Sequence, residues 1–339
     1  MERAAMRRWA WMMSCVLVLA FRVCALPAWE PSDLVLVMGA PGESEYEADY
    51  IRQIEQWAAV AEAGGHRYAR IGFDAELDPP DRDRLRQILA SVPMAGTTPL
   101  WLVLVGHGTF DGKDARFNLR GPDLTPLDLA EWLEPFQRPV VVINTASASA
   151  PFLPALSGPE RVIVTATRSG FEQNATRFGR YLAAAWLADD SDLDRDGQVS
   201  LLEACVAAGR GVAEFYQSAG RLRTEHALLD DNGDGLGTPL DWFRGVRAIK
   251  EPRAGAVADG LRAHQLVLVP SAAERALSAE VRARRDVLER SIEALRQRKS
   301  SLAEEEYYGA LERLLLELAR LLVTPDATAS GSAAAGSTM

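Results

Sequence analysis

Short apolar runs alternate with amphipathic stretches along the first half of the chain. Most of the apolar runs are rich in Val, Ile and Leu, as strands of a parallel sheet are when helices cover both faces. They predict strands at 34–38, 67–71, 100–105, 140–143 and 162–165. The stretches between them predict helices at 45–63, 81–91 and 179–187, with a further helix that starts at Thr125. The alternation predicts an α/β fold with a mostly parallel sheet and helices on both faces.

The last third of the chain is predicted to be mainly helical, after one more strand at 265–269. Apolar residues recur at near-heptad spacing in two successive series, which are Val281, Leu288, Leu295 and Leu302, then Tyr308, Leu311, Leu315, Leu318 and Leu322. Such spacing predicts a helical hairpin or a short coiled coil. The hairpin either packs on its own chain, or it mediates oligomerisation or the docking of a partner.

The first 25 residues are predicted to be a secretory signal peptide. Residues 1–8 carry three arginines, residues 9–21 are mostly apolar, and Val23 and Ala25 stand at positions −3 and −1 before a cut after Ala25. We therefore expect export to a periplasm or to the extracellular space. The alternative is an uncleaved N-terminal membrane anchor. Because no internal apolar run reaches 18 residues, no transmembrane bundle is predicted.

Composition and charge narrow the range of partners. The chain is 48% hydrophobic and 25% charged, which is typical of a globular protein with a substantial core. Its formal charge of −10 argues against binding nucleic acid, because phosphate groups require a basic face. Once the signal peptide is removed, Cys205 is the only cysteine, so no intramolecular disulfide can form. Cys205 lies in a predicted helix at 201–216 and is expected to be a buried apolar residue.

The candidate chemistry lies where two predicted strands end. His107 stands between two glycines directly after the strand at 100–105, and a run of small residues at 144–150, which includes Ser147, follows the strand at 140–143. Ligands of parallel sheets bind at the carboxyl ends of the strands. We therefore take His107 as the candidate functional histidine of this edge.

The order of these segments resembles the caspase/legumain superfamily of cysteine peptidases. An apolar strand ending in His107-Gly108 is followed, about one βα unit later, by an apolar strand ending in small residues. The resemblance runs from about Asp33 to Leu187, roughly half of the chain. It implies a caspase-like fold in which the histidine acts beside a cysteine nucleophile after the next strand. This sequence has no cysteine there, and Ala146 stands at the expected place.

Two functions are compatible with that departure. One is a non-catalytic pseudo-peptidase that serves as a binding or scaffold module for a protein or peptide partner. The other is a peptidase or esterase in which His107 activates a shifted nucleophile, Ser147, with Thr145 or Ser149 as alternatives. No Gly-x-Ser-x-Gly motif accompanies the serine.

A calcium-binding EF-hand loop is predicted over residues 192–203. Its oxygen ligands at positions 1, 3, 5, 7, 9 and 12 are Asp192, Asp194, Asp196, Gln198, Ser200 and Glu203, with Gln198 contributing its backbone carbonyl. Gly197 at position 6 allows the sharp turn that this loop requires. We expect Ca²⁺ to be a structural cofactor, because a metal bound only by the folded state stabilises that state.

A second acidic loop follows at 230–241. Asp230, Asn232, Asp234 and Asp241 take positions 1, 3, 5 and 12, again with glycine at position 6. It departs from the pattern at position 8, where Gly237 replaces an aliphatic residue, and at position 12, where Asp is shorter than Glu. It is interpreted either as a second calcium site, on its own or shared with the first loop, or as a turn rich in Asx residues.

The predicted organisation combines these parts in sequence order. It consists of a signal peptide at 1–25, a caspase/legumain-like α/β domain at 33–190, an EF-hand-like segment at 191–245, a strand plus helical hairpin at 246–323 and a disordered tail at 324–339.

Overall fold

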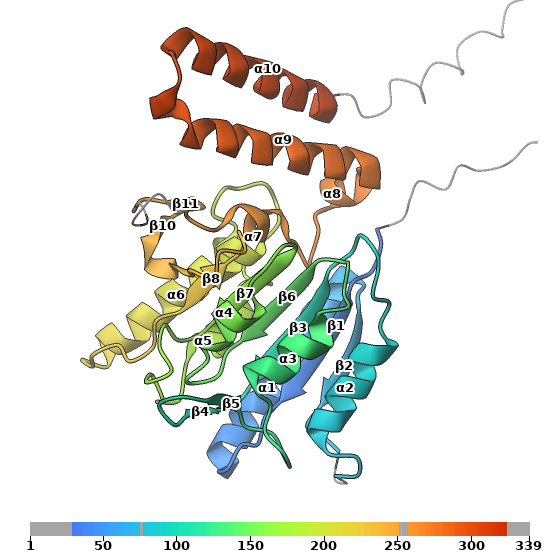
Figure 1. The fold of residues 1–339 in the computed structure, drawn as a ribbon, viewed down its shortest axis with the longest axis vertical. Coiled ribbons are helices and arrows are strands. Elements are labelled where there is room, and N and C mark those ends of the chain that lie inside the picture. Colours follow the sequence, from blue (N-terminus) through green and yellow to red (C-terminus); the bar gives the residue numbers. More distant parts are fainter. Residues whose placement is uncertain (1–28, 75–76, 251, 253–256, 324–339) are drawn as a thin grey trace, which may run out of the picture.

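The computed structural model describes residues 29–74, 77–250, 252 and 257–323. Within them, the centre is a seven-stranded sheet in the order β2-β1-β3-β6-β7-β8-β9 (Figure 1). The bounds are β1 Asp33–Met38, β2 Arg67–Ile71, β3 Leu100–Val105, β6 Val140–Asn144, β7 Arg161–Thr165, β8 Leu228–Asp230 and β9 Thr238–Pro239. The first five strands in this order run parallel, and β8 and β9 add an antiparallel edge. The signal peptide and the tail predicted from the sequence lie outside the described residues.

Helices cover both faces of this sheet. Alternate residues of β1 face opposite sides, so that Leu34 and Leu36 join one apolar cluster while Val35 and Val37 join the other. The first cluster is completed by α1 (Ser44–Gly64), α5 (Phe178–Ala185) and α6 (Leu201–Ser218), and the second by α2 (Asp81–Ser91), α3 (Pro126–Leu133) and α4 (Phe152–Leu156). The predicted α/β fold with a mostly parallel, doubly covered sheet is confirmed.

Two small hairpins decorate the sheet without belonging to it. Strands β4 (Gly108–Phe110) and β5 (Ala115–Phe117) follow β3 directly, and β10 (Phe243–Arg244) pairs with β11 (Arg247–Ala248) further along the chain. The β4–β5 hairpin matters for the site, because it fixes the chain immediately after His107.

The C-terminal region forms a pair of antiparallel helices, α9 (Ala279–Gln297) and α10 (Glu304–Val323), at one end of the α/β body (Figure 1). The predicted helical hairpin is therefore present, and Leu288 and Leu295 of the heptad series are buried in it. Oligomerisation through these helices stays a prediction. Among the described helices, none combines the length and the apolar composition that crossing a membrane requires.

The strand predicted at 265–269 is wrong. Residues Leu261–Gln265 form the short helix α7, and only Val267 makes a β-bridge, to Ser200. The helix is favoured because the carboxylate of Asp231 accepts hydrogen bonds from the backbone N–H groups of Gly260 and Ala263 at its start. A further short helix, α8 (Ala272–Ala276), leads into the hairpin.

Cys205 is expected to be unreactive in the native protein. Its side chain lies in the interior of α6 with no exposed surface, and burial raises the pKa of its thiol. In a chain that starts at residue 26, a disulfide-exchange reagent such as dithionitrobenzoate should label less than one tenth of the thiol within an hour without urea, and one thiol per chain after unfolding. Rapid stoichiometric labelling of the native protein would contradict the buried position.

Candidate functional site

His107 lies at the carboxyl edge of the sheet, between the end of β3 and the start of β4. Its imidazole meets two rings of α1 edge-on, with centroid distances of 4.6 Å to Tyr46 and 5.6 Å to Tyr50. Burial lowers the pKa of His107, and the charge of Glu43 opposes that shift only in part. The imidazole is therefore neutral at neutral pH and is held by aromatic packing.

Ser147 lies in the turn after β6, next to Gly108, and is buried. Its hydroxyl donates to the backbone carbonyl of Gly108 over 2.9 Å and accepts from the backbone N–H of Gly108 over 3.1 Å. Gly108 is needed at this contact, because a Cβ there would lie 2.2 Å from the carbonyl oxygen of Ser147. The hydroxyl thus holds two strand ends together. Within the described residues, no hydrogen bond joins it to the imidazole of His107.

The neighbouring small residues also make structural contacts. Thr145 donates its hydroxyl to the carbonyl of Leu104, Ser149 shares a hydrogen bond with Thr167, and Ala146 is buried. Nucleophilic catalysis by a hydroxyl needs a base within hydrogen-bond reach. The geometry described here gives none of the three hydroxyls such a partner at His107, so the hydrolase hypothesis gains no support from it.

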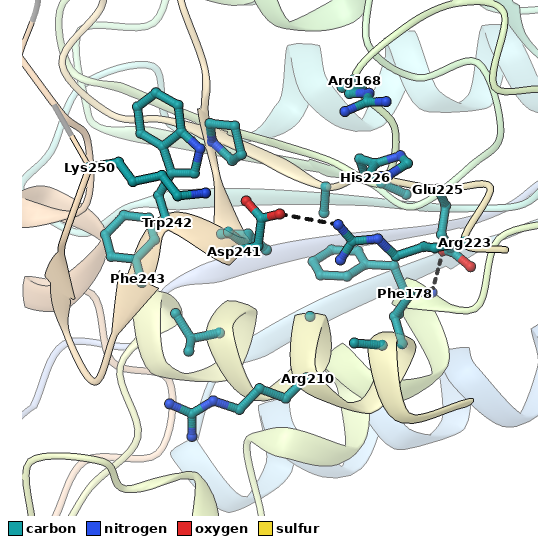
Figure 2. Close-up of a pocket in the computed structure, with 18 residues that line it drawn as sticks. Arg168, Phe178, Arg210, Arg223, Glu225, His226, Asp241, Trp242, Phe243 and Lys250 are labelled. Atoms are coloured by element: carbon teal, nitrogen blue, oxygen red, sulfur yellow. Dashed lines mark hydrogen bonds and ion pairs between the residues drawn. The ribbon is translucent and has the colours of Figure 1, made fainter. Parts of the chain in front are cut away.

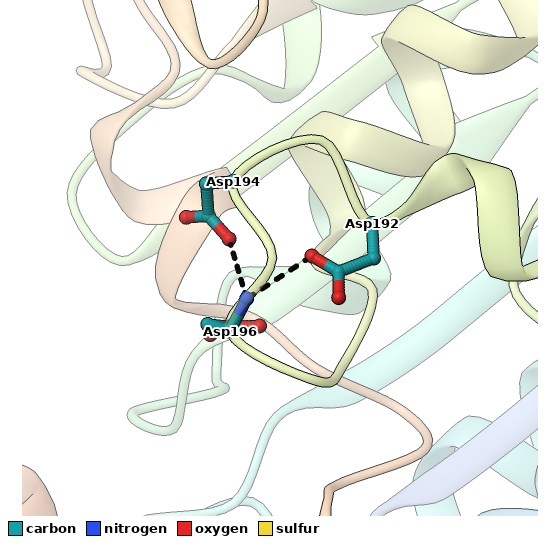
Figure 3. A group of neighbouring side chains, drawn as sticks. All are labelled: Asp192, Asp194 and Asp196. Carbon is teal, nitrogen blue, oxygen red and sulfur yellow. Dashed lines mark hydrogen bonds between the residues drawn. The ribbon is translucent and has the colours of Figure 1, made fainter.

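The first acidic loop joins the end of α5 to the start of α6. Carboxylate oxygens of Asp192, Asp194 and Asp196 lie within 4.8 Å of one another, and the backbone N–H of Asp196 donates to the other two side chains (Figure 3). Burial, and then the nearby carboxylates, raise the pKa values of Asp194 and Asp196. Hard oxygen donors that crowd negative charge in this way suit Ca²⁺, which neutralises them and takes six to eight oxygens.

Glu203 closes the first loop from the first turn of α6. One carboxylate oxygen accepts from the N–H groups of Leu193 and Asp194, at 2.8 and 3.2 Å, while the other accepts from the N–H and hydroxyl of Ser200, at 2.9 and 2.8 Å. The position-12 carboxylate therefore touches positions 2, 3 and 9 of its loop. The structure therefore brings together the carboxylates of Asp192, Asp194 and Asp196, pairs Glu203 with Ser200, and bonds the side chain of Gln198 to Asp196.

The second acidic loop folds in the same way over its first half. Asp230 accepts from the N–H groups of Gly233 and Gly235, both at 3.1 Å, as Asp192 accepts from the corresponding part of the first loop. Asn232 and Asp234 accept from N–H groups two residues further on. Positions 1, 3 and 5 of this loop therefore have the same arrangement as in the first loop.

Asp241 does not complete the second loop, which corrects its predicted role as a ligand. Pro239 ends strand β9, and the turn after it carries Asp241 outward, where its carboxylate lies 3.1 Å from the guanidinium of Arg223 (Figure 2). About half of the Asp241 side chain is exposed. The exit of the loop is not the regular helix that an EF-hand has, because proline and a short strand replace it.

Asp259 takes the place that position 12 leaves vacant. One of its oxygens accepts from the N–H groups of Asp231 and Asn232, at 2.9 and 3.1 Å, and the other from the N–H and hydroxyl of Thr238, at 3.1 and 2.7 Å. These are positions 2, 3 and 9 of the second loop, the same three that Glu203 contacts in the first. The backbone N–H of Asp259 returns a bond to the hydroxyl of Thr238, as that of Glu203 does to Ser200.

Sequence spacing could not identify Asp259, because it lies well beyond the twelve-residue window of the motif. Burial, and then the charge of Asp231, raise its pKa to about 7. Asp230, Asp231 and Asp259 are all buried, and within the described part of the chain none of them forms an ion pair with a basic side chain. Buried carboxylates are costly unless a cation or a proton compensates them.

Helix α7 connects the two loops. Its N-terminal N–H groups bond to Asp231 of the second loop, as described above, and at its other end the carbonyl of Leu266 accepts from the N–H of Leu201. His264, on the same helix, lies 3.4 Å from Asp194 and 3.4 Å from Ser200 of the first loop. The two acidic loops are therefore neighbours through α7 and do not pair directly with each other as the loops of a paired EF-hand do.

The chain described by these elements is similar in fold to solved caspases. Caspase-1 from Spodoptera frugiperda is 10% identical with a TM-score of 0.41, over 61% of this chain and 88% of that one. The Drosophila initiator caspase Dronc is 12% identical at 0.37, over 62% and 85%, and drICE is 14% identical at 0.37, over 57% and 87%. No family model matches the chain, and no curated protein matches it.

Proposed function

We propose that the chain is an exported calcium-binding protein whose α/β domain is a binding module for a protein or peptide partner and carries out no peptidase chemistry. Two calcium ions stabilise it, one in each acidic loop. The first ion is held by the side chains of Asp192, Asp194, Asp196, Ser200 and Glu203 and by the backbone carbonyl of Gln198. The second ion is held by the side chains of Asp230, Asn232, Asp234 and Asp259. The role of the ions is structural, since bound calcium stabilises the folded chain by mass action.

One observation carries the calcium proposal. Two loops that differ in sequence and in their exits direct a carboxylate at the same three positions, from Glu203 in one and from Asp259 in the other. The second carboxylate comes from a distant segment, so local sequence repetition does not explain the match. A shared requirement to enclose a cation with hard oxygens explains it.

The side chains that follow strand β6 support the proposal that no peptidase chemistry takes place beside His107. A methyl group, on Ala146, stands after β6, and the hydroxyl of Ser147 is bonded on both sides to Gly108. The alternative hydrolase, with His107 and Ser147, has no observation in its favour among the described residues.

The test measures calcium binding and hydrolysis on the same sample. The chain from residue 26 is stripped with a chelator and titrated with calcium by calorimetry, and turnover of a mixed peptide library is followed with and without the ion. We expect calcium binding and no cleavage. The absence of any heat of binding together with an unchanged Tm would overturn the calcium role. Cleavage that is abolished in His107→Ala would overturn the proposal that the domain carries out no peptidase chemistry.

A further inference from the structure

A cavity of about 450 Å³ lies between α6 and the segment that follows it, residues 223–250. Its floor is formed by one side of α6 and by Phe178 at the start of α5, and its walls by β9 and the turn after it (Figure 2). This volume is within the range of small-molecule sites in proteins. It is separate from the strand-end pair described above, since neither His107 nor Ser147 lines it.

The charged groups that line the cavity are mainly basic, in a chain whose overall charge is negative. They are Arg168, Arg210, Arg223 and Lys250 against two carboxylates, those of Glu225 and Asp241, with His226 beside them. The carboxylate of Glu225 is already hydrogen-bonded at the start of α5, where it accepts from the N–H groups of Arg177 and Phe178. His226 and Arg168 face Glu172, at 2.6 and 3.4 Å. The guanidinium of Arg210 points away from the remaining groups (Figure 2). The side chains left to act on a ligand are therefore Arg223, Lys250 and Asp241.

Two of these side chains form an ion pair in the lining of the cavity, with 3.1 Å between the guanidinium of Arg223 and the carboxylate of Asp241. Figure 2 shows the ammonium of Lys250 directed toward the same carboxylate from the other side. Asp241 is the residue at position 12 of the second acidic loop that is turned away from that loop. Its carboxylate occupies the position beside Arg223 that the anionic group of a ligand would take.

Aromatic rings surround this cluster. Phe178 and Phe243 are buried, and the half-buried indole of Trp242 lies 5.8 Å from the ammonium of Lys250. Rings of this kind offer flat apolar surface, and the cations beside them offer a charged group to hydrogen-bond. Together they suit a ligand that has both features.

We propose that this cavity binds an organic anion with a flat aromatic body, whose charged group displaces Asp241 from Arg223 and also meets Lys250, while the rings of Trp242 and Phe243 contact the body. The inference adds a small-molecule site to the partner-binding role proposed above and does not rest on that role. It does not depend on calcium, because the side chains that carry it are not ligands of either loop.

The test uses two fluorescent probes that differ in one charged group. Anilinonaphthalene sulfonate is the anionic probe, and N-phenyl-1-naphthylamine is its uncharged counterpart. We expect saturable 1:1 binding of the sulfonate at a stronger affinity than that of the amine. Arg223→Gln should weaken sulfonate binding about tenfold, which corresponds to the loss of about 1.4 kcal/mol from a charged hydrogen bond, and should leave amine binding unchanged.

Asp241→Asn should act in the opposite direction and strengthen sulfonate binding several-fold, because it removes the competing carboxylate. Trp242→Ala should weaken both probes, and Arg221→Gln, an exposed neighbour outside the cavity, should change neither. Equal binding of both probes, or sulfonate binding that responds to neither Arg223→Gln nor Asp241→Asn, would overturn the proposal. Calcium stoichiometry measured on the same variants should stay at the wild-type value, so a failed cavity and a failed calcium role are distinguishable.

Discussion

Replacing Asp259 with Asn is expected to reduce the calcium bound per chain from two ions to one, whereas the same change at Asp241 leaves two. Asp259 contacts positions 2, 3 and 9 of the second loop, and Asp241 is turned outward to Arg223. Calorimetry of the chelator-treated chain measures the stoichiometry directly. The two substitutions are chemically identical, so each serves as the control for the other.

The same pair of variants should differ in thermal stability. Extracellular calcium sites have Kd values around 10⁻⁴–10⁻³ M, and a hundredfold excess over Kd stabilises the folded state by about 2.7 kcal/mol for each site. For a chain of this size that corresponds to roughly 4 °C in Tm for each ion. We expect the calcium-induced rise in Tm to fall by about half in Asp259→Asn and to be unchanged in Asp241→Asn.

A further variant completes this set. Glu203→Gln should also bind one ion, and the double variant with Asp259→Asn should bind none, since each change removes the carboxylate that closes one loop. Comparing Tm with and without calcium separates the lost ion from any loss of stability in the calcium-free protein. Loss of an ion in Asp241→Asn, with two retained in Asp259→Asn, would restore Asp241 as the ligand and contradict the structural match.

Replacing Ser147 with Ala is expected to destabilise the protein by about 1–3 kcal/mol, because it leaves the buried N–H and carbonyl of Gly108 without their hydroxyl partner. Urea denaturation measures this free energy of unfolding. The hydrolase hypothesis expects a different result, since removing a nucleophile abolishes turnover and need not affect stability. A fluorophosphonate reagent should label neither the wild type nor the variant.

Ser169→Ala supplies the matched control for that experiment. The hydroxyl of Ser169 accepts one hydrogen bond, from the N–H of Phe171 in an exposed turn, so its loss should change the free energy of unfolding by less than about 0.5 kcal/mol. An equally small effect at Ser147, combined with fluorophosphonate labelling that His107→Ala prevents, would identify Ser147 as a nucleophile.

The sheet and its helices could be predicted because their signals are local and strong. Strands such as Leu100–Val105 are continuous apolar runs, and helices such as Asp81–Ser91 have apolar residues on one face. The strand predicted at 265–269 failed because the apolar run there has a single β-bridge as its pairing, while Asp231, far away in sequence, supplies a helix start. Tertiary contacts of this kind are invisible to local periodicity.

In the candidate sites, too, local patterns could be predicted from the sequence and contacts between distant segments could not. The proposed ligands of the first loop lie within twelve residues, so their spacing alone predicted that the carboxylates of Asp192, Asp194 and Asp196 would lie together. The second loop was predicted only over its first half, because its closing carboxylate comes from Asp259, in another segment. The structure places Ser147 beside Gly108, the residue after His107, and the bonds of the serine hydroxyl to Gly108 depend on how two strand ends approach, which sequence does not specify.

Helix α7 also touches the C-terminal hairpin, and this contact extends its influence beyond the loops. The side chain of Gln265, its last residue, donates to the carbonyl of Asp286 and to Glu289 of α9, and accepts from Arg290. A five-residue helix therefore has one end on the second loop and the other on the first loop and the hairpin. Its hydrogen bonds link both acidic loops to α9 along a path that does not pass through the sheet.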